Sequence, residues 1–127
     1  MNDVDYHSQN LWFAGMAGNW PLAEFYWEKI LLHMRWTKAA YLAEKDISSH
    51  AAKLAENAAA IERSPNMQVG NAIQKRDTTM FATTYRSMLQ GCYNCHKAID
   101  KPFLRPRMPV KPAQAIINVD PKATWPD

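Results

Sequence analysis

The chain has 127 residues, 47% of them hydrophobic and 21% charged, a composition typical of one globular domain with a substantial core. No apolar run approaches the about 20 residues that cross a bilayer, so we expect no membrane span. The net charge of +3 arises entirely in residues 101–127, where five spaced basic residues stand among six prolines. Five spaced charges are too few for a nucleic-acid-binding segment, so we expect no nucleic acid as a partner.

A turn signal at Gly18–Pro21 separates the first two predicted helices. The first helix is expected from about Asp5 to Ala17. The second is expected over about residues 21–45, because Asn19 is a favourable N-cap and Pro21 suits a first helical turn. Along the second helix, one buried stripe recurs at helical spacing and includes Trp27, Ile30 and Met34.

A third helix is expected to begin near Asp46 or Ser48 and to break or kink at Pro65. The polar cluster Asp77–Thr79 then predicts the start of a fourth helix, whose apolar residues follow at three- and four-residue steps as far as Ile99. Alanine-rich helices with short connections predict an all-α protein, in which residues 1–100 form an antiparallel four-helix bundle.

Residues 101–127 have a different character, because their prolines forbid a long helix. Phe103, Leu104 and Trp125 make this segment too apolar for a free flexible end. We therefore predict an extended, basic, Pro-rich C-terminal tail that packs on the bundle or on a partner.

The only two cysteines lie in Cys92-Tyr-Asn-Cys95-His96. A zinc site would need four ligands, and no other histidine stands beside a second cysteine pair. A thioredoxin-like redox pair belongs at the N-terminus of a helix after a strand, whereas this pair comes late in a helix. The third interpretation is covalent haem attachment, with both thiols bonded to the vinyl groups and His96 as proximal iron ligand. It is the favoured one, and Nδ1 of His96 is expected to meet a carbonyl or a water.

A haem motif near the end of the last helix of a bundle resembles the cytochrome c′ and cytochrome c-556 group. The stretches His7–Gly15, Asn19–Trp27 and Lys101–Arg107 also look like a set of bacterial monohaem c-type cytochromes. The resemblance implies a periplasmic protein carrying one covalent haem c on a helical bundle. Because the start of the chain is acidic and polar rather than a secretory leader, we expect an export signal to have been removed.

The iron ligand opposite His96 is left open by the sequence. Antiparallel packing would bring the start of the first helix level with the haem, which makes His7 and Met16 candidates, with a vacant position as the third possibility. Helical spacing places His7, Leu11 and Gly15 on one face, where small residues would admit a flat macrocycle. Residues expected near the haem are Tyr85 and Phe103 for the ring, and Arg86, Arg105 or Arg107 for the propionates.

These observations predict a periplasmic electron carrier rather than an enzyme, because no distal acid–base pair is evident. The basic tail would dock an acidic redox protein, and a homodimer is common among cytochrome c′-like bundles. The alternative is a five-coordinate haem protein that binds NO or CO.

Overall fold

A computed structural model describes residues 2–43, 49–113 and 117–125, and every regular element among them is helical. The predicted all-α class is therefore confirmed. None of the described helices is long and apolar enough to cross a membrane, as expected. In chain order the elements are α1 (Asn2–Met16), α2 (Trp20–Ala43), α3 (Ser49–Ile61), the π-helical turn η1 (Glu62–Asn66), α4 (Met67–Lys75) and α5 (Thr78–Ala98).

Helix boundaries follow the capping signals of the sequence. Gly18 adopts a left-handed conformation with φ of 72°, and the side chain of Asn19 accepts a hydrogen bond from the Leu22 amide at 3.3 Å. Asp77 caps α5 by accepting from the Met80 amide at 2.9 Å. The predicted start of the third helix, at 46–48, lies outside the described residues.

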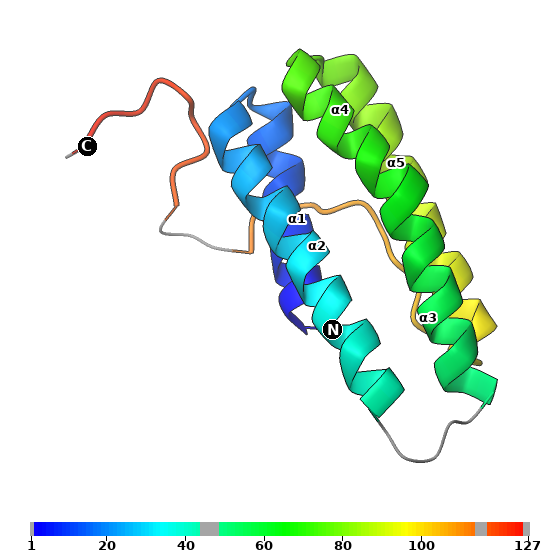
Figure 1. The fold of residues 1–127 in the computed structure, drawn as a ribbon. Coiled ribbons are helices and arrows are strands. Elements are labelled where there is room, and N and C mark those ends of the chain that lie inside the picture. The colour runs from blue at the N-terminus through cyan, green and yellow to red at the C-terminus, as the bar shows by residue number, and fades with distance from the viewer. Residues whose placement is uncertain (1, 44–48, 114–116, 126–127) are drawn as a thin grey trace.

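The expected break at Pro65 is a π-helical turn instead. α3, η1 and α4 continue into one another as a single column beside α5 (Figure 1). A π-turn lengthens the hydrogen-bonding step locally, so a proline, which has no N–H to donate, can stand inside an otherwise continuous helix. The predicted break is therefore wrong, since the helical path continues through Pro65.

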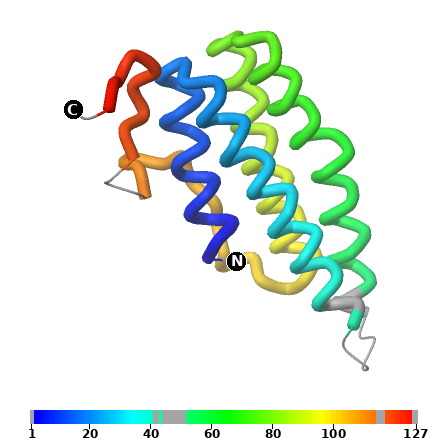
Figure 2. Tube along the Cα trace, turned by 60° about the vertical axis from the view of Figure 1, so that its left-hand side comes forward, coloured from blue at the N-terminus to red at the C-terminus, as the bar shows by residue number. Residues whose placement is uncertain are grey.

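The helices pack in pairs, with α1 beside α2 and the α3–α4 column beside α5 (Figures 1 and 2). α5 also contacts α1, and α2 also contacts α3 and α4. The larger core cluster includes Leu11, Tyr26, Phe81, Tyr85 and Met88, all buried.

A second, smaller core cluster lies near the end of α5 and consists of Leu54, Ile61 and Cys95. Met34 of α2 packs against both clusters, and Ile99 packs against the smaller one. The core is therefore divided, and Cys95 belongs to its minor part.

The small residues of α1 receive an aromatic ring and not a macrocycle. A Cβ atom added at Gly15 would overlap the ring of Phe81, which is fully buried. Sequence spacing correctly placed Leu11 and Gly15 on one buried face, but this face meets α5. The expectation that it admits a flat cofactor is wrong because Phe81 fills that space.

After α5, residues 101–113 run without regular structure from the end of that helix toward α1 (Figure 1). The Ala113 amide donates to Oδ1 of Asn10 on α1 at 3.0 Å, and Met108 packs against the larger core cluster. Most other side chains of this segment are exposed.

Candidate functional site

The sequence motif occupies the last two turns of α5. Because residues three, four and seven apart share one face of a helix, Cys92, Cys95 and His96 point to the same side as Tyr85 and Leu89. All five residues line one cavity of about 730 Å³. This volume lies within the range of about 300–1,000 Å³ found for cofactor and ligand sites.

Three other helices and the chain after α5 complete the cavity wall. α1 contributes Val4, Asp5, Ser8 and Gln9 among others, and α2 contributes Met34, Thr37 and Lys38. α3 presents Leu54, Ala58 and Ile61 at steps of four and three residues, and residues Phe103–Arg107 cover the remaining side. Most of the exposed lining is apolar, which suits a flat hydrophobic group with few polar edges.

The ring of His96 has a fixed partner. Its Nδ1 atom lies 2.6 Å from the main-chain carbonyl oxygen of Leu104. Nδ1 therefore carries the proton and donates, which leaves Nε2 with its lone pair free for a metal. The partner expected for Nδ1 was a carbonyl or a water, and the structure gives a main-chain carbonyl.

Both cysteines are free thiols. Burial, with a smaller contribution from the neighbouring Cys95, raises the pKa of Cys92 to about 11, and burial also raises the pKa of Cys95. A reactive redox pair depends on lowered thiol pKa values and an electropositive setting. The electrostatic environment is therefore the opposite of that which the thioredoxin-like alternative requires.

The two aromatic residues expected near the cofactor both line the cavity. Tyr85 is fully buried, and its hydroxyl donates to the Ser8 carbonyl at 2.7 Å. Burial, the nearby Cys92 and Asp5 together raise its pKa, so Tyr85 is a neutral part of the wall. Phe103 is 67% exposed and covers the cavity from the solvent side.

Basic residues surround the cavity, with Asp5 as the single carboxylate among the described lining residues. The basic lining residues are Lys38, Lys101, Arg105, Arg107 and Lys111. Arg86 lies instead in an adjoining cavity of about 380 Å³, which Arg105 and Arg107 also line. Of the three arginines that the sequence suggested for the propionates, Arg105 and Arg107 line the larger cavity, and Arg86 lines the smaller one beside them.

Neither sequence candidate for the distal ligand lines the cavity. His7 stacks on His33 with ring centroids 5.1 Å apart and contacts Tyr26 at 5.9 Å. Burial first, and then His33, lower the pKa of His7. Met16 stands at the end of α1 and is 41% exposed.

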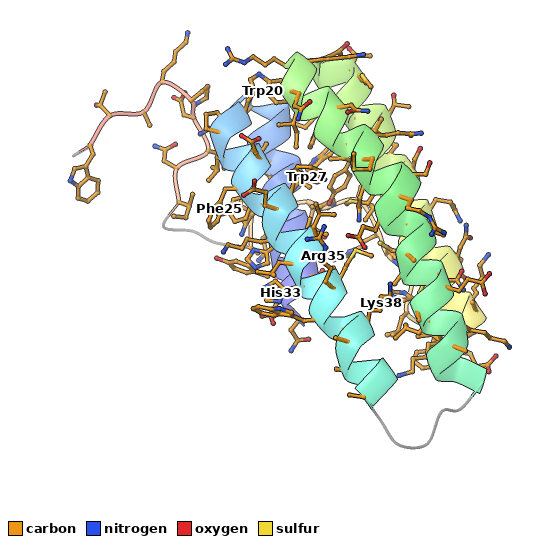
Figure 3. The ribbon with its side chains drawn as sticks, in the orientation of Figure 1. Trp20, Phe25, Trp27, His33, Arg35 and Lys38 are labelled. Carbon is orange, nitrogen blue, oxygen red and sulfur yellow. The ribbon has the colours of Figure 1, made fainter. Side chains whose placement is uncertain are left out.

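The rotation of α1 explains this outcome. Its cavity face carries Val4, Asp5, Ser8 and Gln9, so His7 points to α2 instead. Figure 3 shows the partner of His7, His33, on the opposite side of α2 from Arg35 and Lys38.

Sequence reasoning did not assign Met34, Leu54 and Ile61 to the site, although Met34 was placed in a buried stripe. A carbonyl partner for His96 was among the expectations, but Leu104 was not identified as its source, because side-chain patterns carry no information about main-chain acceptors. The available signal for Met34 was its chemistry, since it is the only sulfur in its predicted stripe.

The donor set fits a porphyrin-held iron better than a bare metal ion. Within the described residues, no group of three or more His, Cys, Asp or Glu side chains is placed to hold a metal. A haem brings four nitrogen ligands of its own and needs only an axial imidazole, which His96 offers with an oriented ring. Comparison with family models, with curated proteins and with solved structures found no match for this chain.

Proposed function

We propose that this chain is a periplasmic monohaem c-type cytochrome that transfers electrons. The haem would be held in an antiparallel four-helix bundle formed by α1, α2, the α3–α4 column and α5. One observation carries the proposal. Cys92, Cys95 and His96 line a single, mostly apolar cavity, and the Leu104 carbonyl orients the imidazole so that Nε2 is free.

Each cysteine would attach the haem by adding its S–H bond across one vinyl double bond. The S–H bond breaks, a C–S bond forms, and the hydrogen goes to the neighbouring vinyl carbon. No external oxidant or reductant is consumed. Both thiols are available for this reaction, because neither is engaged in a disulfide.

When bound, the haem would supply a one-electron iron couple, and the protein would set its potential. Cavity burial raises that potential by excluding water, and the ligand opposite His96 adjusts it further. Arg105 and Arg107, which line both cavities, would pair with the propionates and attract an acidic redox partner. A haem enzyme would need a distal acid–base pair, whereas electron transfer needs none. The sequence offers no clear pair, so we propose a carrier and not an enzyme.

The proposal is tested by producing the exported chain in a bacterium that attaches haem to cytochromes c. A second, established cytochrome c made in the same cells is the positive control. The expected product is coloured, keeps its haem under denaturing conditions, and has the mass of the polypeptide plus one haem. Cys92→Ser/Cys95→Ser should lose the covalent haem. A colourless chain beside a coloured control would overturn the proposal.

Gas binding is the second candidate function. It is favoured by the exclusion of His7 and Met16 from the cavity, which removes the two ligands foreseen for the distal side. An iron with a vacant position would bind CO or NO. The reduced visible spectrum with and without CO separates this function from simple electron transfer.

A further inference from the structure

We propose that Sδ of Met34 is the iron ligand opposite His96, and that Asn66 positions this sulfur. The inference rests on the proposed haem site and adds the identity of its second axial ligand. The distal ligand would therefore come from α2, whereas both sequence candidates for it lie on α1.

Met34 is placed where an axial ligand is needed. It lines the same cavity as Cys95 and His96, and it packs against the small core cluster that contains Cys95. His96 belongs to α5 and is held from the tail by Leu104, whereas Met34 comes from α2. The two ligands would therefore come from different helices, as is needed if the haem is bound between them.

The chemistry of the described lining residues singles out Met34. Apart from Cys92, Cys95 and His96, it is the only sulfur or imidazole among them. Lys38 lies one helical turn further along α2, but an ammonium group must lose a proton before it can bind iron. A thioether needs no such step, and a methionine–histidine pair is a ligand set of electron-transferring haem.

A buried amide already orients the sulfur. Nδ2 of Asn66 lies 3.3 Å from Sδ of Met34, and Asn66 is fully buried. A thioether sulfur accepts weakly and has a second lone pair, so this hydrogen bond leaves one pair for the metal. The amide thereby limits the directions in which the sulfur can point.

The position of Asn66 is itself fixed by the fold. It is the last residue of the π-turn η1, and its carbonyl accepts a hydrogen bond from Nε1 of Trp27 at 2.9 Å. Figure 3 shows Trp27 extending from α2 toward the α3–α4 column. The Oδ1 atom of Asn66 is buried and has no hydrogen-bond partner among the described residues. A polar side chain kept in the core at this cost is consistent with a role for its amide donor.

The test compares four haem-loaded proteins: the parent chain, Met34→Leu, and the controls Met16→Leu and His7→Phe. The parent should show the weak far-red absorption band of a sulfur–iron(III) bond, and its reduced form should not bind CO. Met34→Leu should lose this band, bind CO readily and have a lower reduction potential. Both control variants should match the parent.

Each other outcome has a separate meaning. If Met34→Leu keeps the far-red band and still excludes CO, Met34 is not the ligand. Loss of the band in Met16→Leu, or a parent that lacks it and binds CO, also overturns the inference while leaving the haem proposal intact. A parent with no covalent haem contradicts the proposed function itself. A circular dichroism spectrum of each variant checks that the helices persist.

Discussion

The imidazole of His96 and the carbonyl of Leu104 are joined at 2.6 Å across the turn that ends α5. The turn is built by the Lys101 amide, which donates to the His96 carbonyl at 2.8 Å, and by Asp100, whose φ of 59° is left-handed. A feature of the main chain thus orients the proposed proximal ligand. We therefore expect any change that relaxes this turn to be detected at the iron of the proposed haem.

Asp100 offers a direct test of that relationship. Asp100→Val should destabilise the turn by about 1–2 kcal/mol, because a β-branched residue resists a left-handed conformation. Asp100→Gly is the matched control, since it also removes the side chain but tolerates positive φ. In reduced protein carrying Met34→Leu, the iron–histidine stretching frequency in resonance Raman spectra should fall for the valine variant only. Equal frequencies would show that the turn does not hold the ring.

The contact between Gly15 and Phe81 predicts an effect on stability. Gly15→Ala should lower the free energy of unfolding, because the added methyl group overlaps a buried ring and overpacking a core costs about 1–3 kcal/mol. The gain of about 1 kcal/mol that alanine brings inside a helix offsets part of this cost, so the expected net loss is up to about 2 kcal/mol. Urea unfolding measures the difference.

Combination with Phe81→Leu provides the control for Gly15→Ala. The two changes should be less damaging together than the sum of their separate effects, since leucine vacates the space that the methyl group needs. Strict additivity would contradict the contact.

The helices were predictable because their boundaries are local. Asn19 and Asp77 act as caps within three residues of their partners, so their signals can be read from the sequence. Helical spacing likewise placed Cys92, Cys95 and His96 on one face. The environment of that face was not predictable, because it depends on how each neighbouring helix is rotated.

His7 and Met34 illustrate this limit. Both lie on helices that were expected, and both are chemically suited to bind iron. The rotation of α1 turns His7 to His33, while the rotation of α2 brings Met34 to the cavity. Those rotations result from long-range packing, such as Phe81 against Gly15, which no periodicity records. Pro65 is similar, since a break or kink was expected there but a continuous π-helical turn was not.

His7 should make stability depend on pH. Its pKa in the folded protein is lowered by burial first, then by repulsion from His33 and Lys29, with Asp3 opposing. The unfolded chain therefore binds a proton more readily near its ordinary pKa of about 6.5, so stability should fall as pH decreases through that region. His7→Phe should flatten this dependence in urea unfolding between pH 5 and pH 8. An unchanged slope would show that His7 is not responsible.

The basic residues beside the cavity should control reactions with charged oxidants and reductants. Arg105→Gln/Arg107→Gln should slow reduction of the anion ferricyanide by the haem-loaded protein and speed oxidation of the cation hexaammineruthenium(II). Both effects should shrink as salt increases, because charges are screened over about 10 Å at 0.1 M. Lys53→Gln, on α3 and outside both cavities, is the matched control. If the double variant changes the rates with both reagents in the same way, or not at all, these arginines do not guide electron transfer through their charge.

Asn66 should adjust the reduction potential through Met34. Asn66→Leu has a similar volume but removes the N–H donor to the sulfur. Without that hydrogen bond the sulfur keeps more electron density and favours iron(III), so the reduction potential should fall and the far-red band should weaken or shift. Asn66→Gln, which retains an amide, should recover part of both signals. The reduction potential is measured by redox titration of the folded protein. If Asn66→Leu has the same potential as the parent, Asn66 contributes only to packing. A purely structural role would change the unfolding midpoint without moving the band, so the two measurements together distinguish a positioning residue from a core residue.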